Sequence, residues 1–204
     1  MIAIVHYGLG NVAAIANIYK KLGIEVTLAT SAAELERAER IILPGVGAFD
    51  WAIGRLNDSG MRPSLEKRVL GDGKPILGIC VGMQMLARGS EEGELPGLGW
   101  IDGDVKRFDV THFAAKTHLP HMGWNDVRAN DAAGLFAGLA SGARFYFLHS
   151  YFFAAAHPEH VVAVTDYAGA FAASVRAGNV YGVQFHPEKS HHWGVRLLKN
   201  FAEL

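Results

Sequence analysis

The segment from Pro75 to Leu86 constrains the fold more than any other part of the sequence, because it changes from strand to helix at a cysteine. Branched apolar residues introduced by Gly73-Lys74-Pro75 predict a buried strand that ends at Cys80, and a helical pattern follows. Gly78 and Gly82 leave room for a tight turn and for close approach of neighbouring backbone. A Gly-x-Cys-x-Gly turn from strand to helix is the thiol counterpart of a nucleophile elbow.

Such an elbow would place the Cys80 sulfur at the amino end of the following helix. Free backbone N–H groups and the positive end of the helix dipole favour a thiolate at that position. The alternative is a buried, unreactive cysteine in a glycine-containing turn, since free cysteine is often only a small core residue. The elbow segment alone leaves both interpretations open.

The bulk composition predicts one compact domain that spans residues 1–204, with 50% hydrophobic and 19% charged residues. A formal net charge of −1 gives no reason to expect nucleic acid or a membrane surface as a partner. The single cysteine excludes an internal disulfide and suits a reducing compartment. The chain enters an apolar strand at once, without a basic leader, and no apolar run approaches the roughly 20 residues that span a bilayer. We therefore expect a cytoplasmic protein.

Strands and helices alternate through the first half of the chain. Strands are predicted at 2–5, 25–29, 40–43 and 76–80, and helices at 12–22, 31–37, 49–57 and 63–70. This order predicts an α/β fold, namely a three-layer open, mostly parallel sheet with helices on both faces and ligands at its carboxyl edge. After Ser90, glycines and prolines separate shorter strands, predicted at 105–108, after Pro120, and at 145–151, 161–165, 172–175 and 180–185, before a last helix at 192–202.

The first strand-to-helix turn permits a second interpretation. Gly8, Gly10 and Ala13 fit the Gly-x-Gly-x-x-Gly/Ala fingerprint of dinucleotide-binding folds. That fingerprint also needs an acidic residue at the end of the second strand, where this chain has Ala29-Thr30-Ser31. A tight structural turn is therefore favoured over a nucleotide site.

Three predicted strand ends carry groups that complement a cysteine nucleophile. A thiolate needs a base and an acid to complete acyl transfer, and His186 follows the last strand two residues before Glu188. Because alternate residues of an extended segment face the same way, we expect the Glu188 carboxylate to orient the His186 imidazole. Backbone N–H groups of Val81 and of the Val46–Gly47 loop are the predicted oxyanion hole for a reaction at Cys80.

Three segments that contain these residues resemble the signatures of class I glutamine amidotransferases: Pro44–Gly47, Gly78–Gln84 and Gly182–Glu188. Three more segments resemble the glutaminase subunits of imidazole glycerol phosphate synthase, an enzyme of histidine biosynthesis: Pro120–Asn125, His149–Tyr151 and Glu188–Ser190. The resemblance extends over essentially the whole chain. It implies hydrolysis of L-glutamine, with the ammonia channelled to a (β/α)8-barrel cyclase/synthase subunit in a heterodimer, and no cofactor.

The resemblance also implies roles for individual residues. Cys80 would attack the glutamine carboxamide, His186 would shuttle the proton and Glu188 would orient His186. Positions that match the glutamine pocket or the oxyanion loop are Val46, Gly47, Val81, Gln84, His149, Ser150 and Tyr151. Positions that match the surface facing the barrel subunit are Asn11, Met122, Trp124, Tyr146 and Lys189.

Some features leave more than one interpretation open. His6 stands where the family has an acidic residue, and Gly99–Gly103 with Ser190–His192 are similar to a paralogous branch that supplies ammonia for surface-polysaccharide sugar synthesis. The sequence also permits a catalytically silent scaffold or a stand-alone cysteine hydrolase. The histidines are numerous, but with one cysteine and no His-Glu-x-x-His arrangement we expect no metal site.

Overall fold

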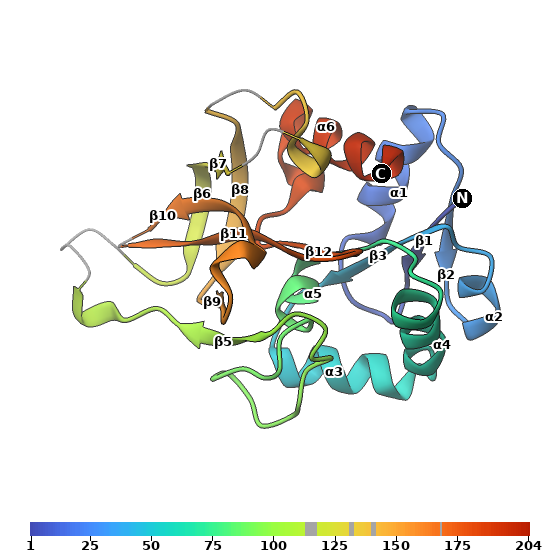
Figure 1. Cartoon of the computed structure of the whole chain (residues 1–204), viewed down its shortest axis with the longest axis horizontal. Coiled ribbons are helices and arrows are strands. Elements are labelled where there is room, and N and C mark those ends of the chain that lie inside the picture. The colour runs from blue at the N-terminus through green and yellow to red at the C-terminus, as the bar shows by residue number, and fades with distance from the viewer. Residues whose placement is uncertain (113–117, 131–132, 140–141, 168) are drawn as a thin grey trace.

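The computed structural model describes residues 1–112, 118–130, 133–139, 142–167 and 169–204, and a sheet of eight strands forms its centre (Figure 1). In spatial order the strands are β2 (Val26–Ala29), β1 (Ile2–Val5), β3 (Arg40–Gly45), β4 (Ile76–Cys80), β12 (Val180–Val183), β11 (Ala170–Ala177), β10 (Val161–Asp166) and β7 (Arg128–Ala129). The five strands from β2 to β12 are parallel, and β11, β10 and β7 extend the sheet in antiparallel fashion.

Helices cover both faces of this sheet. The helices are α1 (Val12–Lys21), α2 (Ala32–Leu35), α3 (Phe49–Asp58), α4 (Arg62–Glu66), α5 (Val81–Gln84) and α6 (His191–Glu203). Figure 1 shows α1 and α6 together on one side of the sheet and α3 and α4 on the other. Strands β1, β3 and β4 are buried along almost their whole length, as expected when both faces are covered. The predicted three-layer, mostly parallel α/β fold is confirmed.

Two small antiparallel sheets lie beside the central one. One pairs β5 (Gly103–Arg107) with β9 (Tyr151–Ala155), and the other pairs β6 (His121–Asp126) with β8 (Arg144–His149). The prediction of one strand over 145–151 was wrong, because the chain changes partner at Ser150. Residues before Ser150 pair with β6 and those after it pair with β5, so the aromatic run spans two sheets.

Candidate active site

The backbone at Cys80 has the strained geometry of a nucleophile elbow. Its φ is 55° and its ψ is −113°, a region that side-chain-bearing residues rarely adopt and that costs on the order of 1–3 kcal/mol. The turn closes because Gly78 and Gly82 lack side chains: a Cβ at Gly78 would lie 2.5 Å from the Gly82 carbonyl oxygen, and one at Gly82 would collide with the Leu43 carbonyl. The predicted elbow is therefore present, although α5 after it has only four residues.

Strand register brings the other predicted segments to the same sheet edge. Gly45 at the end of β3 lies directly opposite Cys80 at the end of β4. On the other side of β4, Val183 at the end of β12 pairs with Ile79. Val183 is three residues before His186, so His186 follows closely after this strand end. Three segments distant in sequence thus converge on the carboxyl edge of the parallel strands, where α/β folds bind ligands.

His186 and Glu188 form a hydrogen-bonded pair, but not through the extended segment that the sequence predicted. Pro187–Lys189 is a 3-10 turn, and this turn brings Glu188 Oε1 to 3.0 Å from His186 Nδ1. Both side chains are almost fully buried. The turn is fixed from β8, because the His186 N–H donates to the Tyr146 carbonyl at 2.8 Å and the Tyr146 N–H donates to the Ser190 hydroxyl at 3.0 Å. Within the turn, the Ser190 hydroxyl donates to the His186 carbonyl at 2.6 Å.

The charge state of His186 depends on its two partners. Burial disfavours the imidazolium, but contacts with the Cys80 sulfur and with the Glu188 carboxylate outweigh it and raise the pKa of His186 to about 10. The Glu188 carboxylate is hydrogen-bonded to His186 Nδ1, so Nε2 is the ring nitrogen that remains available to the Cys80 sulfur. This arrangement suits an imidazolium that donates a proton during a reaction at the sulfur.

A cavity of about 320 Å³ opens over the Cys80 sulfur. Its size falls at the lower end of the range for small-molecule sites. All seven residues predicted for the substrate pocket and oxyanion loop line it, together with Cys80, His186 and Lys189. The sequence did not indicate three further lining residues, which are Glu92, Pro120 and Leu148.

The oxyanion loop is fixed at both ends. Before the loop, the Tyr7 hydroxyl donates to the Pro44 carbonyl at 2.7 Å. After it, the first N–H of α3, at Phe49, donates to Glu92 Oε2 at 2.9 Å. Gly47 has a φ of +85°, which favours glycine, and lies between these two anchors. Glu92 therefore lines the cavity and also holds the loop that frames it.

Of the residues predicted to face a partner, Lys189 lines the cavity, and three more lie on the sheet whose Leu148 also lines it. Met122 and Trp124 on β6 pair with Leu148 and Tyr146 on β8, and all four side chains project from the same face of this sheet. Met122 is 64% exposed and Trp124 is 36% exposed, so neither is a core residue. The Lys189 Nζ lies over the Tyr146 ring, 5.7 Å from its centroid, while Asn11 is exposed at the start of α1.

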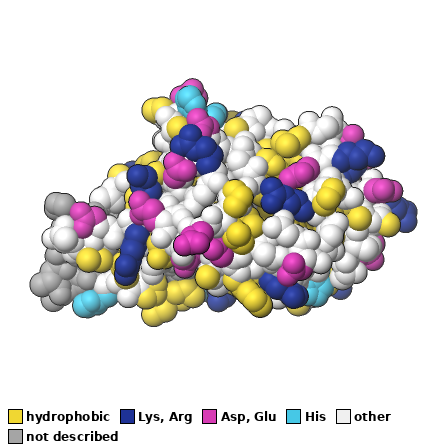
Figure 2. Space-filling model, turned by 90° about the horizontal axis from the view of Figure 1, so that it is seen from below, with side chains coloured by type: hydrophobic (Ala, Val, Ile, Leu, Met, Phe, Trp, Pro, Cys, Tyr) yellow, Lys and Arg dark blue, Asp and Glu magenta, His cyan; other side chains and the backbone are white. Residues whose placement is uncertain are grey.

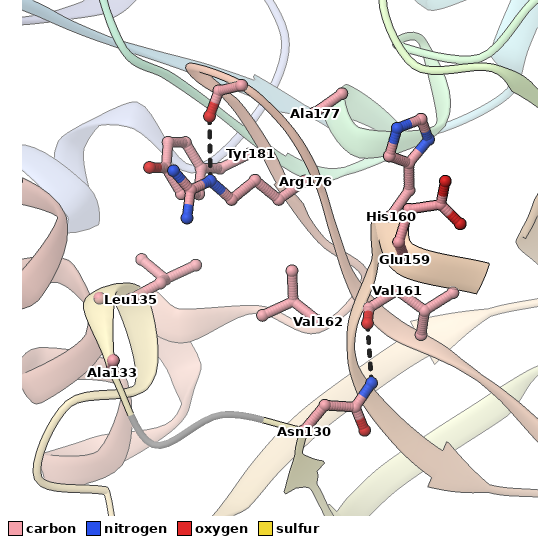
Figure 3. A pocket seen from close by; sticks show the side chains of 12 residues that line it. Asn130, Ala133, Leu135, Glu159, His160, Val161, Val162, Arg176, Ala177 and Tyr181 are labelled. Atoms are coloured by element: carbon pink, nitrogen blue, oxygen red, sulfur yellow. Dashed lines mark hydrogen bonds between the residues drawn. The ribbon is translucent and has the colours of Figure 1, made fainter. Parts of the chain in front are cut away.

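A second, larger cavity of about 500 Å³ lies at the other edge of the sheet, beside the start of β12 (Figure 3). Figure 3 shows Arg176 against Tyr181, with Glu159 and His160 across the opening. The Arg176 guanidinium carbon lies 4.9 Å from the Tyr181 ring centroid, and its Nε donates to the Gly178 carbonyl at 2.9 Å. None of the predicted site residues lines this cavity, so the chemistry of Cys80 belongs to the smaller one.

The described residues also show how charged side chains and potential metal ligands are distributed. Acidic and basic side chains are interspersed on the face shown in Figure 2, without a broad area of one sign. Across the described ranges, no group of three or more His, Cys, Asp or Glu side chains is placed to hold a metal ion. Within the same ranges, no helix combines the length and the apolar character needed to cross a membrane.

The fold and this site define a class of protein. The family model for class I glutamine amidotransferases matches residues 3–204, and the chain belongs to this family. Two solved structures share the fold over 99% of this chain and 97% of theirs. One is described as a glutamine amidotransferase, with a TM-score of 0.76 and 22% identity, and the other as PurLQS from Thermotoga maritima, with a TM-score of 0.71 and 20% identity.

Curated relatives at higher identity are more specific. The chain is 57% identical to the imidazole glycerol phosphate synthase subunit HisH of Bdellovibrio bacteriovorus, over the full length of both chains. It is 45% identical to the subunit of the same name from Leptospira interrogans, again over both full lengths. It is 41% identical to subunit HisH 2 of Methanococcus maripaludis, over 100% of this chain and 99% of the relative.

Proposed function

We propose that this protein is the glutaminase subunit of an imidazole glycerol phosphate synthase and hydrolyses L-glutamine to glutamate and ammonia. One observation carries the proposal: the strained Cys80 elbow, the His186–Glu188 pair and the cavity above them occur together in a chain of the class I amidotransferase family. The family match over residues 3–204 supports a single amidotransferase domain.

In the proposed reaction, the Cys80 thiolate attacks the side-chain carbonyl carbon of glutamine. The carbonyl oxygen becomes an oxyanion that accepts hydrogen bonds from the N–H groups of Val81 and the Val46–Gly47 loop. His186 then protonates the leaving nitrogen, ammonia departs, and a γ-glutamyl thioester remains on Cys80. Water, deprotonated by His186, attacks the thioester and releases glutamate with the thiol regenerated. Glu188 holds the imidazole in one orientation throughout.

Glu92 gives the cavity a means to select an amino acid. It carries the one acidic side chain among the described lining residues, at the rim formed with the start of α3. Its carboxylate is suited to the α-ammonium group of glutamine, because a charged hydrogen bond is stronger than a neutral one. Gln84, Ser150 and Tyr151 supply further polar groups to the lining.

The ammonia would pass to a (β/α)8-barrel synthase subunit that docks over the cavity as a heterodimer in the cytoplasm. The names of the relatives support this acceptor over surface-polysaccharide synthesis. The exposed apolar face of the β6–β8 sheet supports the docking position, because Leu148 lines the cavity and shares this face with Met122, Trp124 and Tyr146. Aromatic and methionine side chains are enriched in such interfaces.

The decisive experiment measures glutamate release from glutamine by the purified chain, alone and with the histidine-pathway barrel subunit of the same organism. We expect strong stimulation by that subunit and no release by Cys80→Ala under either condition. Stimulation only by a barrel subunit encoded beside sugar-modifying genes would move the acceptor to polysaccharide synthesis. Release by Cys80→Ala, or silence of the native chain with every barrel subunit, would overturn the proposal.

A further inference from the structure

A continuous set of buried hydrogen bonds joins strand β6 to the Cys80 sulfur. It contains the side chains of Asn125, His121, His149, Gln84, Gln184 and Cys80 and the backbone carbonyl of Tyr151, and we call it the Tyr151 network. Except for Asn125, every contributing side chain belongs to a residue that is at most 6% exposed. Two arms meet at the Tyr151 carbonyl: His149 Nδ1 lies 2.7 Å from its oxygen, and Gln84 Nε2 lies 3.0 Å from it.

The carbonyl fixes the direction of the histidine arm. Because a carbonyl can only accept, His149 must carry its proton on Nδ1, and its Nε2 is then an acceptor. His121 Nδ1 lies 3.0 Å from that nitrogen and must donate to it. The remaining His121 nitrogen, Nε2, therefore accepts from the Asn125 amide at 3.4 Å, and the same amide donates to the Asp166 carbonyl at 2.7 Å.

Burial keeps both imidazoles in these neutral forms. Desolvation lowers the pKa of His121 to about 4. It also lowers the pKa of His149 to about 3, helped by the nearby charges of His121 and His186 and opposed by the bond to Tyr151. Both histidines are thus predicted to be neutral Nδ1–H tautomers above about pH 5. This is the less common tautomer in water, and its presence can be measured.

The same carbonyl fixes the direction of the amide arm. Gln84 must turn its NH2 group toward the Tyr151 oxygen, and the second hydrogen of that group reaches Gln184 Oε1 at 3.1 Å. The Gln184 oxygen is therefore directed at Gln84, so its NH2 group is directed at the Cys80 sulfur, 3.8 Å away. Gln184 is fully buried in the segment between β12 and His186.

We propose that the Tyr151 network is a positioning device that presents an N–H of Gln184 to the Cys80 thiolate, and that His121 holds this network in place from outside the cavity. The proposal rests on the proposed role of Cys80 as nucleophile. Among the described residues, the sulfur also has His186 and the Leu148 carbonyl as polar neighbours, and the carbonyl is 3.8 Å away. The Leu148 carbonyl can bond only the neutral thiol, whereas the Gln184 amide is a neutral side-chain donor that favours the charged form.

The network makes Gln184 and His121 positioning residues rather than catalytic ones. If His121 lost its donor, His149 Nε2 would no longer need to accept. His149 could then take the Nε2–H form and release the Tyr151 carbonyl, and Gln84 would no longer be held by a fixed acceptor. An asparagine at position 121 has a side-chain N–H near the place of His Nδ1, whereas leucine has nearly the same shape as asparagine without a donor. The two variants therefore differ in the hydrogen bond and little else.

The test is alkylation of Cys80 by iodoacetamide on the rising, low-pH part of its pH–rate profile, where the thiolate fraction limits the rate, without glutamine and without a partner subunit. Because Cys80 is the single cysteine of the chain, the rate reports on this sulfur alone. Loss of a hydrogen bond to a charged group should slow alkylation by Gln184→Met by about tenfold. His121→Leu should slow it by about threefold, and His121→Asn should stay within about twofold of the native rate. Nitrogen-15 spectra should show the Nδ1–H tautomer of His149 in His121→Asn and lose it in His121→Leu.

A buried amide outside the network provides the control. Asn200 in α6 is 5% exposed and donates to the Leu135 and Ala137 carbonyls at 3.0 and 2.8 Å, so Asn200→Leu removes a comparable group and should leave alkylation unchanged. A native alkylation rate in folded Gln184→Met, or equal rates in His121→Asn and His121→Leu, would overturn the inference. If alkylation follows the predicted pattern but glutamate is never released, the proposed function fails and the network stands.

Discussion

At the scale of single residues, the site combines a strained backbone with a buried charged pair. The Cys80 conformation persists because neighbouring strands fix it, and the His186 imidazole is held by a carboxylate that is itself buried. Removing one member of such a pair leaves the other without its partner in a region of low dielectric constant. The Glu188 side chain should therefore matter far more than an ordinary surface carboxylate.

We predict that Glu188→Gln lowers kcat for glutamate release by about a hundredfold or more, because the imidazole loses the group that orients it and stabilises its positive charge. Without the carboxylate the pKa of His186 should fall from its raised value, and the pH profile of kcat should shift to lower pH. The measurement is steady-state kinetics in the presence of the barrel subunit. Glu203→Gln, at an exposed position in α6, is the control and should change kcat by less than twofold. Equal kcat values for the two variants would contradict the role of Glu188.

Single residues also show what the sequence could not reveal. Cys80, His186 and Glu188 stand in short, recognisable motifs, so their chemistry could be predicted. Glu92 lies in an irregular, glycine-rich segment, and its contact with Phe49 depends on how two loops fold together. Gln184 lies within a recognised motif, but the direction of its amide follows from the Tyr151 carbonyl, more than thirty residues away. Contacts of this kind arise from tertiary structure and leave no periodic pattern.

At the scale of elements, the turn between β4 and α5 works because three backbone segments approach one another closely. Gly45, Gly78 and Gly82 each lie where a Cβ would meet backbone atoms. Backbone cannot move aside as a side-chain end can, so these glycines are packing requirements as well as turn formers. The glycines that flank the cysteine thus predicted the elbow correctly, whereas the length of the helix after it could not be read from the pattern.

We predict that Gly82→Ala destabilises the protein by at least about 2 kcal/mol and abolishes rapid alkylation of Cys80, because the added methyl collides with the Leu43 carbonyl. Gly54→Ala in α3 is the matched control. A Cβ there meets nothing within 4 Å, so this variant should stabilise the protein by about 0.5–1 kcal/mol. Urea unfolding of both variants is the measurement. Native stability in Gly82→Ala would show that the elbow has more room than its geometry implies.

Alternation of strands and helices was sufficient to predict the parallel half of the sheet, because each βαβ unit leaves its own hydrophobic pattern. The strands of the two smaller sheets were harder to predict from the sequence. The aromatic run at 145–151 has the composition of one strand, and only pairing with two different partners divides it at Ser150. Pairing of this kind is decided between distant segments, so a single sequence does not contain a local signal for it.

At the scale of the whole molecule, the exposed apolar face of the β6–β8 sheet predicts where a partner binds. We predict that Met122→Asp weakens binding of the barrel subunit by about tenfold or more, because it puts a charge at the centre of an apolar contact. Thermal stability should remain unchanged, since Met122 is 64% exposed. Leu70→Asp is the control, because Leu70 is similarly exposed, at 59%, and is not part of that sheet. Calorimetric titration with the barrel subunit measures both, and equal affinities would place the interface elsewhere.

The whole molecule should also lose stability as the solution is acidified. His121 and His149 have folded-state pKa values of about 4 and about 3, below the ordinary value of 6.5, so between these limits the unfolded chain binds more protons than the folded one. The free energy of unfolding therefore rises with pH up to about 6.5, and at pH 5 the two histidines together should lower it by a few kcal/mol.

His186 acts in the opposite sense at higher pH. Because its pKa is raised to about 10, the stabilisation that its protonated form provides is fully present below pH 6.5 and is lost as the pH rises toward 10.

The expected result is a stability maximum near pH 6.5, measured by urea unfolding at constant ionic strength. His121→Asn removes one of the two buried imidazoles and should flatten the fall between about pH 6.5 and about pH 5 while leaving the high-pH limb in place. Stability at pH 5 equal to that at the expected maximum in the native protein would mean that these histidines accept protons without disturbing the fold. In that case the fixed tautomers of the Tyr151 network could not be maintained by burial.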